Sequence, residues 1–315
     1  MIRISNTDTT ADRRAGVVIP IYNRASVVRA TLDSVICQTQ PPETLIVVDD
    51  GSTDGSPDAV EAWAAETRPP FPIRVIRAVH HTAANARNIG WRELDDIPFV
   101  AFLDSDDCWP IDFLARTIEL LAQHPQAVAV TADRRFFDQR GEMVRFDDCR
   151  RLVRDPLLWM FQHGAGIASC TLLRSSVVAE VGGWDARYGA AEDSVLFTAI
   201  AQLGEWLHAP GTPVDFFHGN ALSRNEENNL SRRHADAYRR WAHTYESIFE
   251  GLISRSNGDQ LERLRAPLAV YWYRAGKQLE TLGCNQEAVD CYRRAVQWNR
   301  LFPRAWLRLL VQGRT

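Results

Sequence analysis

The chain has 315 residues, of which 45% are hydrophobic and 24% are charged, a composition typical of a globular protein. Its formal net charge of −4 provides no basic surface for phosphates, so nucleic acid is excluded as an expected partner. The six cysteines lack metal-ligand spacing, which favours reduced thiols in the cytoplasm. Residues 1–15 form a polar tail, and no apolar run of about 18 residues occurs, so we expect neither export nor a membrane span.

Strands and helices are predicted to alternate over the first third of the chain. Short apolar runs bounded by turn residues predict the strands, and Ser26 is the expected N-cap of the first helix. The predicted strands are 16–20, 44–48, 73–77 and 99–103, and the helices between them are 26–39, 56–66 and 82–91. This alternation indicates an α/β fold with a doubly wound, mostly parallel sheet, which binds ligands at the carboxyl ends of its strands.

The pattern changes after residue 110, because the later strands no longer alternate regularly with helices. Helices are predicted at 111–124, 155–163, 175–181 and 191–203, and strands at 127–132, 143–146, 169–173 and 212–218. Residues 219–231 are polar and rich in turn formers, which is typical of either a lid or a disordered loop. We place a domain boundary near Leu230, between a domain at 16–230 (halves 16–110 and 111–230) and a helical region at 231–315.

The helical region contains one predicted helix pair. Seven residues fall at the offsets of a tetratricopeptide unit: Trp272, Ala275, Gly276, Leu279, Ala288, Tyr292 and Ala295. One such unit cannot bury its own apolar face, so we expect it to pack on the sheet domain, with a second copy or another partner as the alternative. The many arginines of this region indicate either a solvated face or contact with an anionic membrane surface.

Acidic side chains gather at the ends of predicted elements. Asp104, Asp106 and Asp107 follow an apolar strand, at the sheet edge where Tyr22 and Asp50 end two other strands. The three acids fit either a divalent-metal site or an acidic turn that caps the next helix. No GxGxxG or GxxxxGK[ST] loop follows a strand, which disfavours a dehydrogenase but allows a nucleotide held by side chains and a metal.

Five segments together resemble the family 2 inverting glycosyltransferases of the A-type nucleotide-diphospho-sugar transferase fold. They occur in the family's order over residues 16–220, and the helical region lies outside the resemblance. The segments are Val17-Val18-Ile19-Pro20-Ile21-Tyr22-Asn23, Val47-Val48-Asp49-Asp50-Gly51-Ser52-Thr53-Asp54, Ala86-Arg87-Asn88-Ile89-Gly90, Leu103-Asp104-Ser105-Asp106-Asp107 and Glu192-Asp193.

The resemblance implies a metal-dependent nucleotide site. Asp106 would bind Mn²⁺ or Mg²⁺ directly, and Asp104 would lie near the metal and the ribose. His218 is a candidate for the metal or diphosphate, or a loop anchor, and Asp107 is expected to cap the following helix. The expected nucleotide-binding residues include Asp50 at the uracil edge and Tyr22 stacked on the base: Pro20, Tyr22, Asn23, Asp50, Ser52, Arg87, Asp104 and Ser105. For Arg87 the alternative is a surface ion pair.

The resemblance also implies the reaction. Asp193, paired in sequence with Glu192, would be the general base for an acceptor hydroxyl, although acids in a first helical turn also serve as caps. Trp184 would stack on the acceptor sugar, or else belong to the core. The implied function is transfer of a sugar from a nucleotide donor, UDP foremost, to a glycan or lipid-linked acceptor in surface polysaccharide biosynthesis. A nucleotidyltransferase and a non-catalytic interaction protein are the alternatives. We expect the protein to be located in the cytoplasm, with peripheral attachment at the inner face of the membrane as the alternative.

Overall fold

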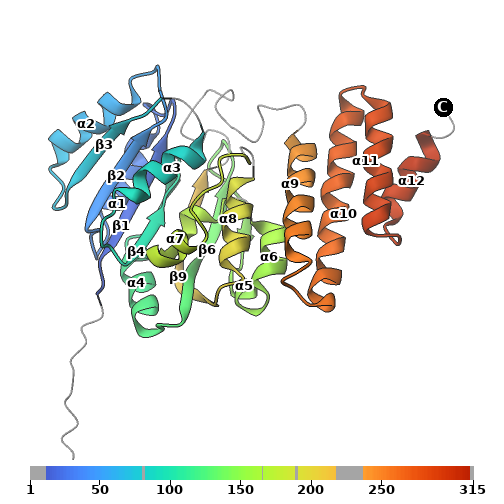
Figure 1. Cartoon of the computed structure of the whole chain (residues 1–315). Coiled ribbons are helices and arrows are strands. Elements are labelled where there is room, and N and C mark those ends of the chain that lie inside the picture. The colour runs from blue at the N-terminus through green and yellow to red at the C-terminus, as the bar shows by residue number, and fades with distance from the viewer. Residues whose placement is uncertain (1–11, 80–81, 165, 189–190, 218–236, 313–315) are drawn as a thin grey trace, which may run out of the picture.

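The computed structural model describes residues 12–79, 82–164, 166–188, 191–217 and 237–312, and in this part of the chain nine strands form one sheet (Figure 1). Their order is β3-β2-β1-β4-β8-β6-β9-β5, and β7 pairs with β6 outside this path. The strands are β1 (Ala15–Ile21), β2 (Thr44–Asp49), β3 (Ile73–Arg77), β4 (Phe99–Phe102), β5 (Asp107–Cys108), β6 (Ala127–Phe137), β7 (Met143–Asp147), β8 (Thr171–Arg174) and β9 (Glu205–Phe217).

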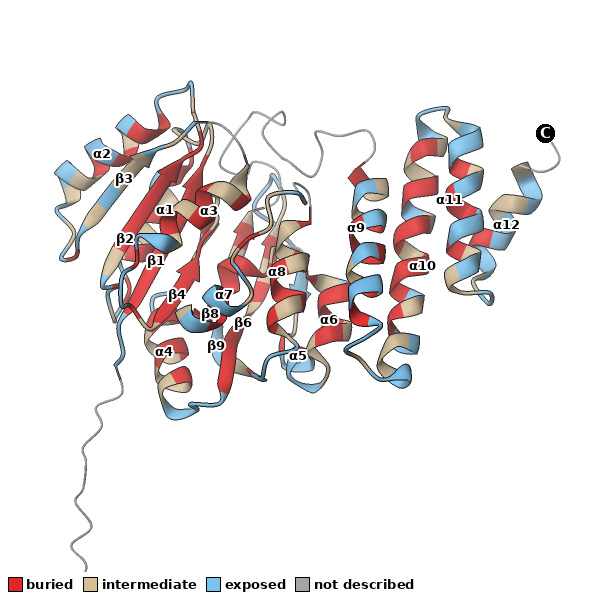
Figure 2. Ribbon diagram, viewed as in Figure 1, coloured by how far each residue is buried: buried red, intermediate tan, exposed pale blue. Residues whose placement is uncertain are grey.

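The two halves of the sheet differ in strand direction. β1 pairs in parallel with both β2 and β4, and β2 pairs in parallel with β3, as the alternating pattern predicts. β8 then pairs antiparallel with both β4 and β6, which makes the second half mixed. Figure 2 shows buried residues along β1, β2 and β4, as expected for strands covered on both faces. The parallel strands therefore end at one edge, where their loops can meet.

Twelve α-helices and one short 3₁₀ segment are formed within the described residues. They are α1 (Val28–Ile36), α2 (Ser56–Thr67), α3 (Ala83–Arg92), α4 (Phe113–Gln123), α5 (Arg150–Arg154), α6 (Pro156–His163), η1 (Ala168–Cys170), α7 (Ser175–Glu180), α8 (Glu192–Ile200), α9 (Ala237–Leu252), α10 (Gly258–Thr281), α11 (Asn285–Trp298) and α12 (Pro303–Gln312). The prediction that Ser26 caps the first helix is wrong, because Val27 holds the N-cap position of α1 without a side-chain hydrogen bond. Thr82 does cap α3, since its hydroxyl accepts a hydrogen bond from the Asn85 N–H.

The C-terminal helices share a second hydrophobic core with the sheet domain. Leu157 and Phe161 of α6 belong to the same buried cluster as Tyr245 of α9 and Trp272 of α10. The seven residues of the predicted helix pair lie on α10 and α11 and are all buried. Gly276 is required there, because a Cβ atom would lie 2.5 Å from the Tyr292 ring.

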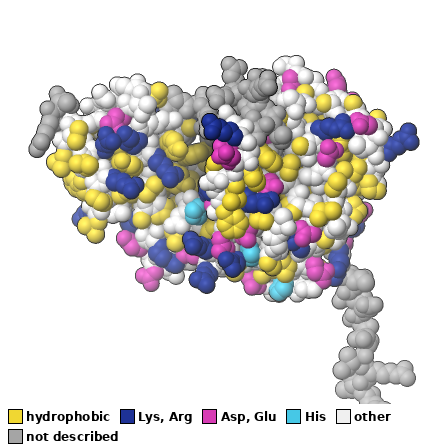
Figure 3. Space-filling view, turned by 180° about the vertical axis from the view of Figure 1, so that it is seen from behind, with side chains coloured by type: hydrophobic (Ala, Val, Ile, Leu, Met, Phe, Trp, Pro, Cys, Tyr) yellow, Lys and Arg dark blue, Asp and Glu magenta, His cyan; other side chains and the backbone are white. Residues whose placement is uncertain are grey.

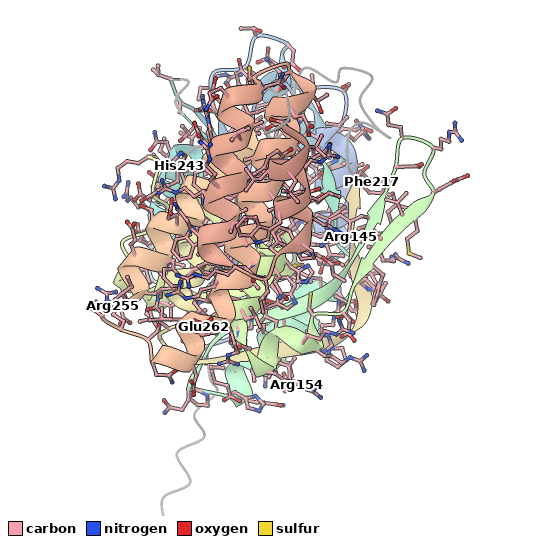
Figure 4. The ribbon with its side chains drawn as sticks, turned by 90° about the vertical axis from the view of Figure 1, so that its right-hand side faces the viewer. Arg145, Arg154, Phe217, His243, Arg255 and Glu262 are labelled. Carbon is pink, nitrogen blue, oxygen red and sulfur yellow. The ribbon has the colours of Figure 1, made fainter. Side chains whose placement is uncertain are left out.

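Two views place this helical region beside the sheet. In Figure 1, α9, α10, α11 and α12 stand next to one another at the end of the molecule away from β3. Figure 4 looks onto these helices and shows Arg145 of the β6–β7 hairpin on the opposite side of them from His243 of α9. Within the described residues, no helix combines the length and apolarity needed to cross a membrane. The predicted boundary at Leu230 and the polar loop at 219–231 lie outside the described residues.

Candidate functional site

The loops after β1 and β2 are tied together by their own polar groups. The Asn23 N–H donates to Ser52 Oγ at 2.8 Å, and the Thr53 N–H donates to Asn23 Oδ1 at 2.9 Å. Asn23 has a φ of 52°, a conformation that asparagine tolerates better than most side chains. The Asp50 N–H donates to the Ile21 carbonyl at 2.8 Å. Asn23 and Ser52, predicted to bind nucleotide, therefore also have a structural role in fixing this pair of loops.

The other predicted nucleotide-binding residues of this edge are held by the strands. Pro20 lies within β1, opposite Val48 of β2, and is buried. Tyr22 follows at the end of β1 and is half-buried, and Asp50 is 4% exposed at the end of β2. Their contact with a nucleotide stays a prediction, but the adjacent pairing of β1 and β2 does bring them to one edge.

The acidic segment after β4 begins beside these loops. The Asp104 N–H donates to Ser169 Oγ at 3.1 Å, and Asp106 Oδ2 lies 3.7 Å from the Arg24 guanidinium. Burial raises the pKa of Asp106, the Arg24 charge lowers it, and the Asp104 charge raises it further, with an increase as the result. The Asp106 side chain keeps 40% of its surface exposed and the Asp104 side chain 28%, whereas Ser105 between them is buried. Asp106 is therefore the more open of the two carboxylates of the Asp-x-Asp sequence.

Asp107 does not have the role that its position suggested. It pairs with Phe216 as the first residue of β5, and its side chain is buried. Burial, with the charges of Asp106 and Asp104, raises the pKa of Asp107 well above its ordinary value of 3.8. Asp112, not Asp107, occupies the N-cap position of α4. The prediction that Asp107 caps this helix is wrong, because a short antiparallel strand intervenes.

The acidic segment offers a partial metal site. Within the described ranges, no group of three or more His, Cys, Asp or Glu side chains is arranged to hold a metal ion, and His218 lies outside those ranges. Asp104 and Asp106 supply carboxylate oxygens, and the pKa of Asp106 is raised chiefly by burial, with the Asp104 charge as a further cause that a cation would offset. Mg²⁺ and similar ions are commonly bound by one or two carboxylates, with phosphate and water completing the shell. The donor set fits a cation of that kind.

Arg87 of α3 connects the acidic segment to the start of α8. Its guanidinium donates to Asp104 Oδ1 at 2.6 Å and to Glu192 Oε1 at 3.1 Å, and it lies 3.8 Å from Asp193 Oδ1. Although burial disfavours its charge, the three carboxylates, Asp104 foremost, raise the pKa of Arg87. The predicted alternative of a surface ion pair is half right: Arg87 pairs with acids, but only 5% of its side chain is exposed.

Asp193 lies in a setting suited to a general base. Its side chain is largely buried, and its Oδ2 accepts a hydrogen bond from the Gly166 N–H at 2.9 Å. Burial, together with the charges of Glu192 and Asp104, raises the pKa of Asp193 to about 7, against the opposing effect of Arg87. Its Oδ1 accepts no hydrogen bond from any described residue. The position in the first turn of α8 would also serve helix capping, but a near-neutral pKa suits proton transfer.

Of the two roles predicted for Trp184, the structure shows the one in the core and not the stacking on an acceptor sugar. The residue is 2% exposed, and its ring meets those of Phe102 and Phe197 edge-on, with centroids 5.1 Å and 6.0 Å away. The Arg87 guanidinium lies 4.4 Å from the ring centroid. The indole therefore supports Arg87 from the core through a cation–π contact.

Two residues of the Ala86-to-Gly90 segment have roles that the sequence alone did not reveal. Asn88 donates to the Trp184 carbonyl at 2.7 Å and accepts from the Trp184 N–H at 2.9 Å. Gly90 allows close packing of α3 on the sheet, because a Cβ atom would lie 2.4 Å from Val18 Cγ1. The available signal was the run itself, in which neighbouring positions of one helix carry Arg, Asn and Gly. These positions face acids, a loop backbone and a strand respectively.

Sequence comparison finds similarity over the part of the chain that carries the loops after β1 and β2, Arg87 and the acidic segment, whereas Glu192 and Asp193 follow the last residue matched by the family model. Residues 16–182 match the family model described as glycosyl transferase family 2. The chain is similar to the succinoglycan biosynthesis protein ExoW of Rhizobium meliloti (strain 1021), with 29% identity over 204 residues. The match covers 58% of this chain and 61% of ExoW, which is less than two thirds of that protein.

Comparison with solved structures extends the similarity to most of the chain. TarS 1–349 of S. aureus in complex with UDP-GlcNAc aligns with a TM-score of 0.65 and 16% identity, covering 90% of this chain and 81% of that one. The mannosyltransferase PcManGT from Pyrobaculum calidifontis in complex with GDP-Man and Mn²⁺ aligns with a TM-score of 0.61 and 22% identity, covering 97% and 82%. At such identities the likeness concerns the fold.

Proposed function

The chain belongs to glycosyl transferase family 2 and has the A-type fold, and on that premise we propose that it is an inverting glycosyltransferase that uses a nucleotide-diphospho-sugar. The observation that carries the proposal is Asp193, a largely buried carboxylate with a pKa raised to about 7. Arg87 connects it to Asp104 of the acidic segment. The proposed base, Asp193, and the proposed donor-binding residue Asp104 thus both lie beside the buried guanidinium of Arg87.

Asp193 is the proposed general base, with Glu192 as its neighbour on Arg87. Asp193 Oδ1 would take the proton from the acceptor hydroxyl as that oxygen attacks the anomeric carbon, while the bond to the diphosphate breaks on the opposite face. The carbon–oxygen bond to the acceptor forms with inversion, and the electron pair leaves with the diphosphate. One carboxylate is sufficient, because the leaving diphosphate needs charge stabilisation and not a proton. The Gly166 N–H holds the second oxygen of Asp193 during this step.

The donor is proposed to be a UDP-sugar. Asp50 would accept hydrogen bonds from the uracil edge, Tyr22 would stack on the ring, and Pro20 would line the pocket. The UDP-GlcNAc complex of TarS supports this choice. Because PcManGT was solved with GDP-Man, a GDP-sugar is the alternative donor that the experiments must compare with a UDP-sugar. Ser105 and Arg87 stay proposed contacts of the nucleotide. For Arg87, contact with a diphosphate would compete with its bond to Asp104.

Asp106 and Asp104 are the proposed holders of Mn²⁺ or Mg²⁺, which when bound would neutralise charge on the leaving diphosphate. In a thermal-shift assay we expect UDP with Mn²⁺ to stabilise the protein by about 2.7 kcal/mol at 100 times its dissociation constant. Asp106→Asn should lose most of the Mn²⁺-dependent part, because it removes one charged ligand. Asp290→Asn, an exposed change on α11, is the matched control. No response to UDP, GDP or dTDP with either metal would contradict the proposal.

The acceptor is proposed to be a glycan or a lipid-linked saccharide in surface polysaccharide biosynthesis. The similarity to a succinoglycan biosynthesis protein supports this class. A lipid-linked acceptor would require the enzyme to work at a membrane, at its cytoplasmic face. The surface of α12 is the feature that fits such a location.

The outer face of α12 is apolar and bordered by arginines. Trp306, Leu307, Leu310 and Val311 fall on one side of the helix and are 47–62% exposed. Arg304 is exposed beside them, and no acidic residue occurs between residues 299 and 312. Figure 3 shows hydrophobic and basic side chains together at the end of the molecule that carries α12. This combination matches helices that lie in the interface of anionic membranes.

We expect the protein to sediment with vesicles that contain phosphatidylglycerol and not with phosphatidylcholine alone. Leu307→Ser with Leu310→Ser should weaken vesicle binding at least about tenfold, since burying one leucine contributes roughly 1.5–3 kcal/mol. Ile253→Ser, at an exposed apolar residue between α9 and α10, should leave binding unchanged. If the double variant instead abolishes self-association and leaves vesicle binding intact, the face is a contact between copies.

A further inference from the structure

A buried tyrosine of the helical region reaches the helix that carries Asp193. Tyr245 of α9 is 2% exposed, and its hydroxyl lies 2.6 Å from Ser194 Oγ, at the residue after Asp193. The same hydroxyl donates to the Met160 carbonyl of α6 at 3.2 Å. A phenol has one proton, so with Met160 as its acceptor, the Tyr245 oxygen accepts from the Ser194 hydroxyl and also interacts with the Tyr271 hydroxyl. Tyr245 thus joins α6 and α8.

The two segments that Tyr245 joins are the ones that position the carboxylate of Asp193. The Met160 carbonyl also accepts the Gly164 N–H at 2.9 Å, two residues before Gly166 in the sequence. Gly166, with a φ of 72°, presents its N–H to Asp193 Oδ2. On the other side, Ser194 is part of the first turn of α8. The Tyr245 hydroxyl therefore connects α6, which precedes the Gly166 N–H, with α8, which carries the Asp193 carboxylate that accepts from it.

The aromatic surroundings hold Tyr245 in place. Its ring stacks on Tyr271 of α10, with centroids 4.2 Å apart and planes at 16°, and it contacts Phe161 of α6 at 5.1 Å. All three belong to the second hydrophobic core. The hydroxyl is thus fixed by packing from α6 and from α9 and α10, of which the last two lie beyond residues 16–182 of the family match.

We propose that Tyr245 is a positioning residue for Asp193, so that the C-terminal helices complete the catalytic site of the sheet domain. The inference rests on the proposed function, in which Asp193 is the base. Other charged or polar groups that face Asp193 are Arg87 of α3, Glu192 of α8, Asp104 and the Gly166 N–H. Of these, the Gly166 N–H lies two residues after Gly164, whose N–H shares the Met160 carbonyl with the Tyr245 hydroxyl.

The test is the pH dependence of kcat in the full chain with Tyr245→Phe. Loss of the bridge leaves the Ser194 hydroxyl without its partner and loosens the bond from Gly166 to Asp193. We expect kcat to fall about tenfold, because small misplacements of a catalytic group are costly, while donor KM changes less than about twofold. The acidic limb should move to higher pH, since the hydrogen bond from Gly166 stabilises the ionised form of Asp193.

A second variant and a control keep the test decisive. Ser194→Ala removes the same bridge from its other end, so it should change kcat and the pH profile in the same direction. The double variant should have a kcat no lower than that of the more impaired single variant. Tyr292→Phe is the control: this buried tyrosine of α11 donates to Glu280 Oε2 at 2.8 Å and should alter stability only. If Tyr245→Phe does not fold, Ser194→Ala carries the test alone.

The outcomes separate this inference from the proposed function. A wild-type pH profile and kcat in Tyr245→Phe and Ser194→Ala, with Asp193→Asn inactive, would overturn the positioning role and leave the proposed function intact. Full transfer by Asp193→Asn would instead remove the base assignment on which both rest.

Discussion

Asp193→Asn is expected to lower kcat about a thousandfold, within the range that general-base catalysis contributes, while UDP binding is retained. The asparagine keeps the size of the side chain and can still accept the Gly166 N–H, but it cannot take a proton from the acceptor. Transfer would be measured as released nucleotide, and UDP binding by calorimetry. Loss of UDP binding together with activity would show that Asp193 serves the donor site and is not the base.

Glu192→Gln is the matched control for this variant. It replaces the neighbouring acid, which bonds to Arg87 through Oε1, and should retain transfer. Because the Glu192 charge contributes to the raised pKa of Asp193, its removal should move the acidic limb to lower pH. If Glu192→Gln were inactive and Asp193→Asn active, the roles of the two acids would be reversed.

The pKa of Asp193 also has consequences for pH dependence. A base with a pKa of about 7 is ionised above that pH, so the wild-type rate should rise as pH increases through about 7. The folded-state pKa exceeds the ordinary value of 3.8, so the folded state holds this proton more tightly than the unfolded state. The contribution of Asp193 to the free energy of unfolding therefore declines as pH rises from about 4 to about 7. Asp193→Asn should lack this decline.

Arg87→Met is expected to lower the free energy of unfolding by about 3–5 kcal/mol at pH 8, the usual effect of breaking a buried ion pair. The change leaves Asp104, Glu192 and Asp193 clustered without the cation that they share. Because the Arg87 charge lowers the pKa of Asp193, its loss should raise the folded-state pKa of Asp193 further, so the folded variant binds this proton more readily. The stability deficit should therefore shrink as pH falls from 8 to 5. Urea unfolding at the two pH values would measure both effects.

Arg29→Met provides the comparison for that experiment. Arg29 donates to Glu66 and lies near Asp33, but it is more than half exposed, so its removal should have little effect at either pH. An Arg87→Met protein as stable as wild type at pH 8 would contradict the view that Arg87 is the shared counter-ion of the site.

The sequence was sufficient for the features that depend on local pattern. Apolar runs predicted the parallel strands. Because the carboxyl ends of parallel strands lie at one edge of a sheet, Tyr22, Asp50 and Asp104 were expected at the same edge. Periodicity reports which face of an element is apolar, but not which partner covers it. A place in the core was one of the two roles predicted for Trp184, but its contact with Arg87 could not be predicted for that reason.

Contacts between distant segments account for the other differences. Arg87 forms hydrogen bonds with Asp104, 17 residues away in the sequence, and with Glu192, 105 residues away. No local pattern specifies such pairs. Asp107 was expected to cap a helix because its local sequence does not reveal the short pairing of β5 with β9. That pairing joins segments about a hundred residues apart. Tyr245 was unremarkable in sequence, since its role depends on Ser194 and Met160 from two other elements.

The second hydrophobic core determines how this enzyme can be recombined with its relatives. Leu157 and Phe161 of α6 are covered by the C-terminal helices, although α6 lies inside the segment that matches the family. A chimera that joined this sheet domain to a foreign C-terminal region would have to cover both side chains anew, and it would also lose Tyr245. The natural unit of exchange is therefore the set of C-terminal helices together with the surface of α6 on which they rest.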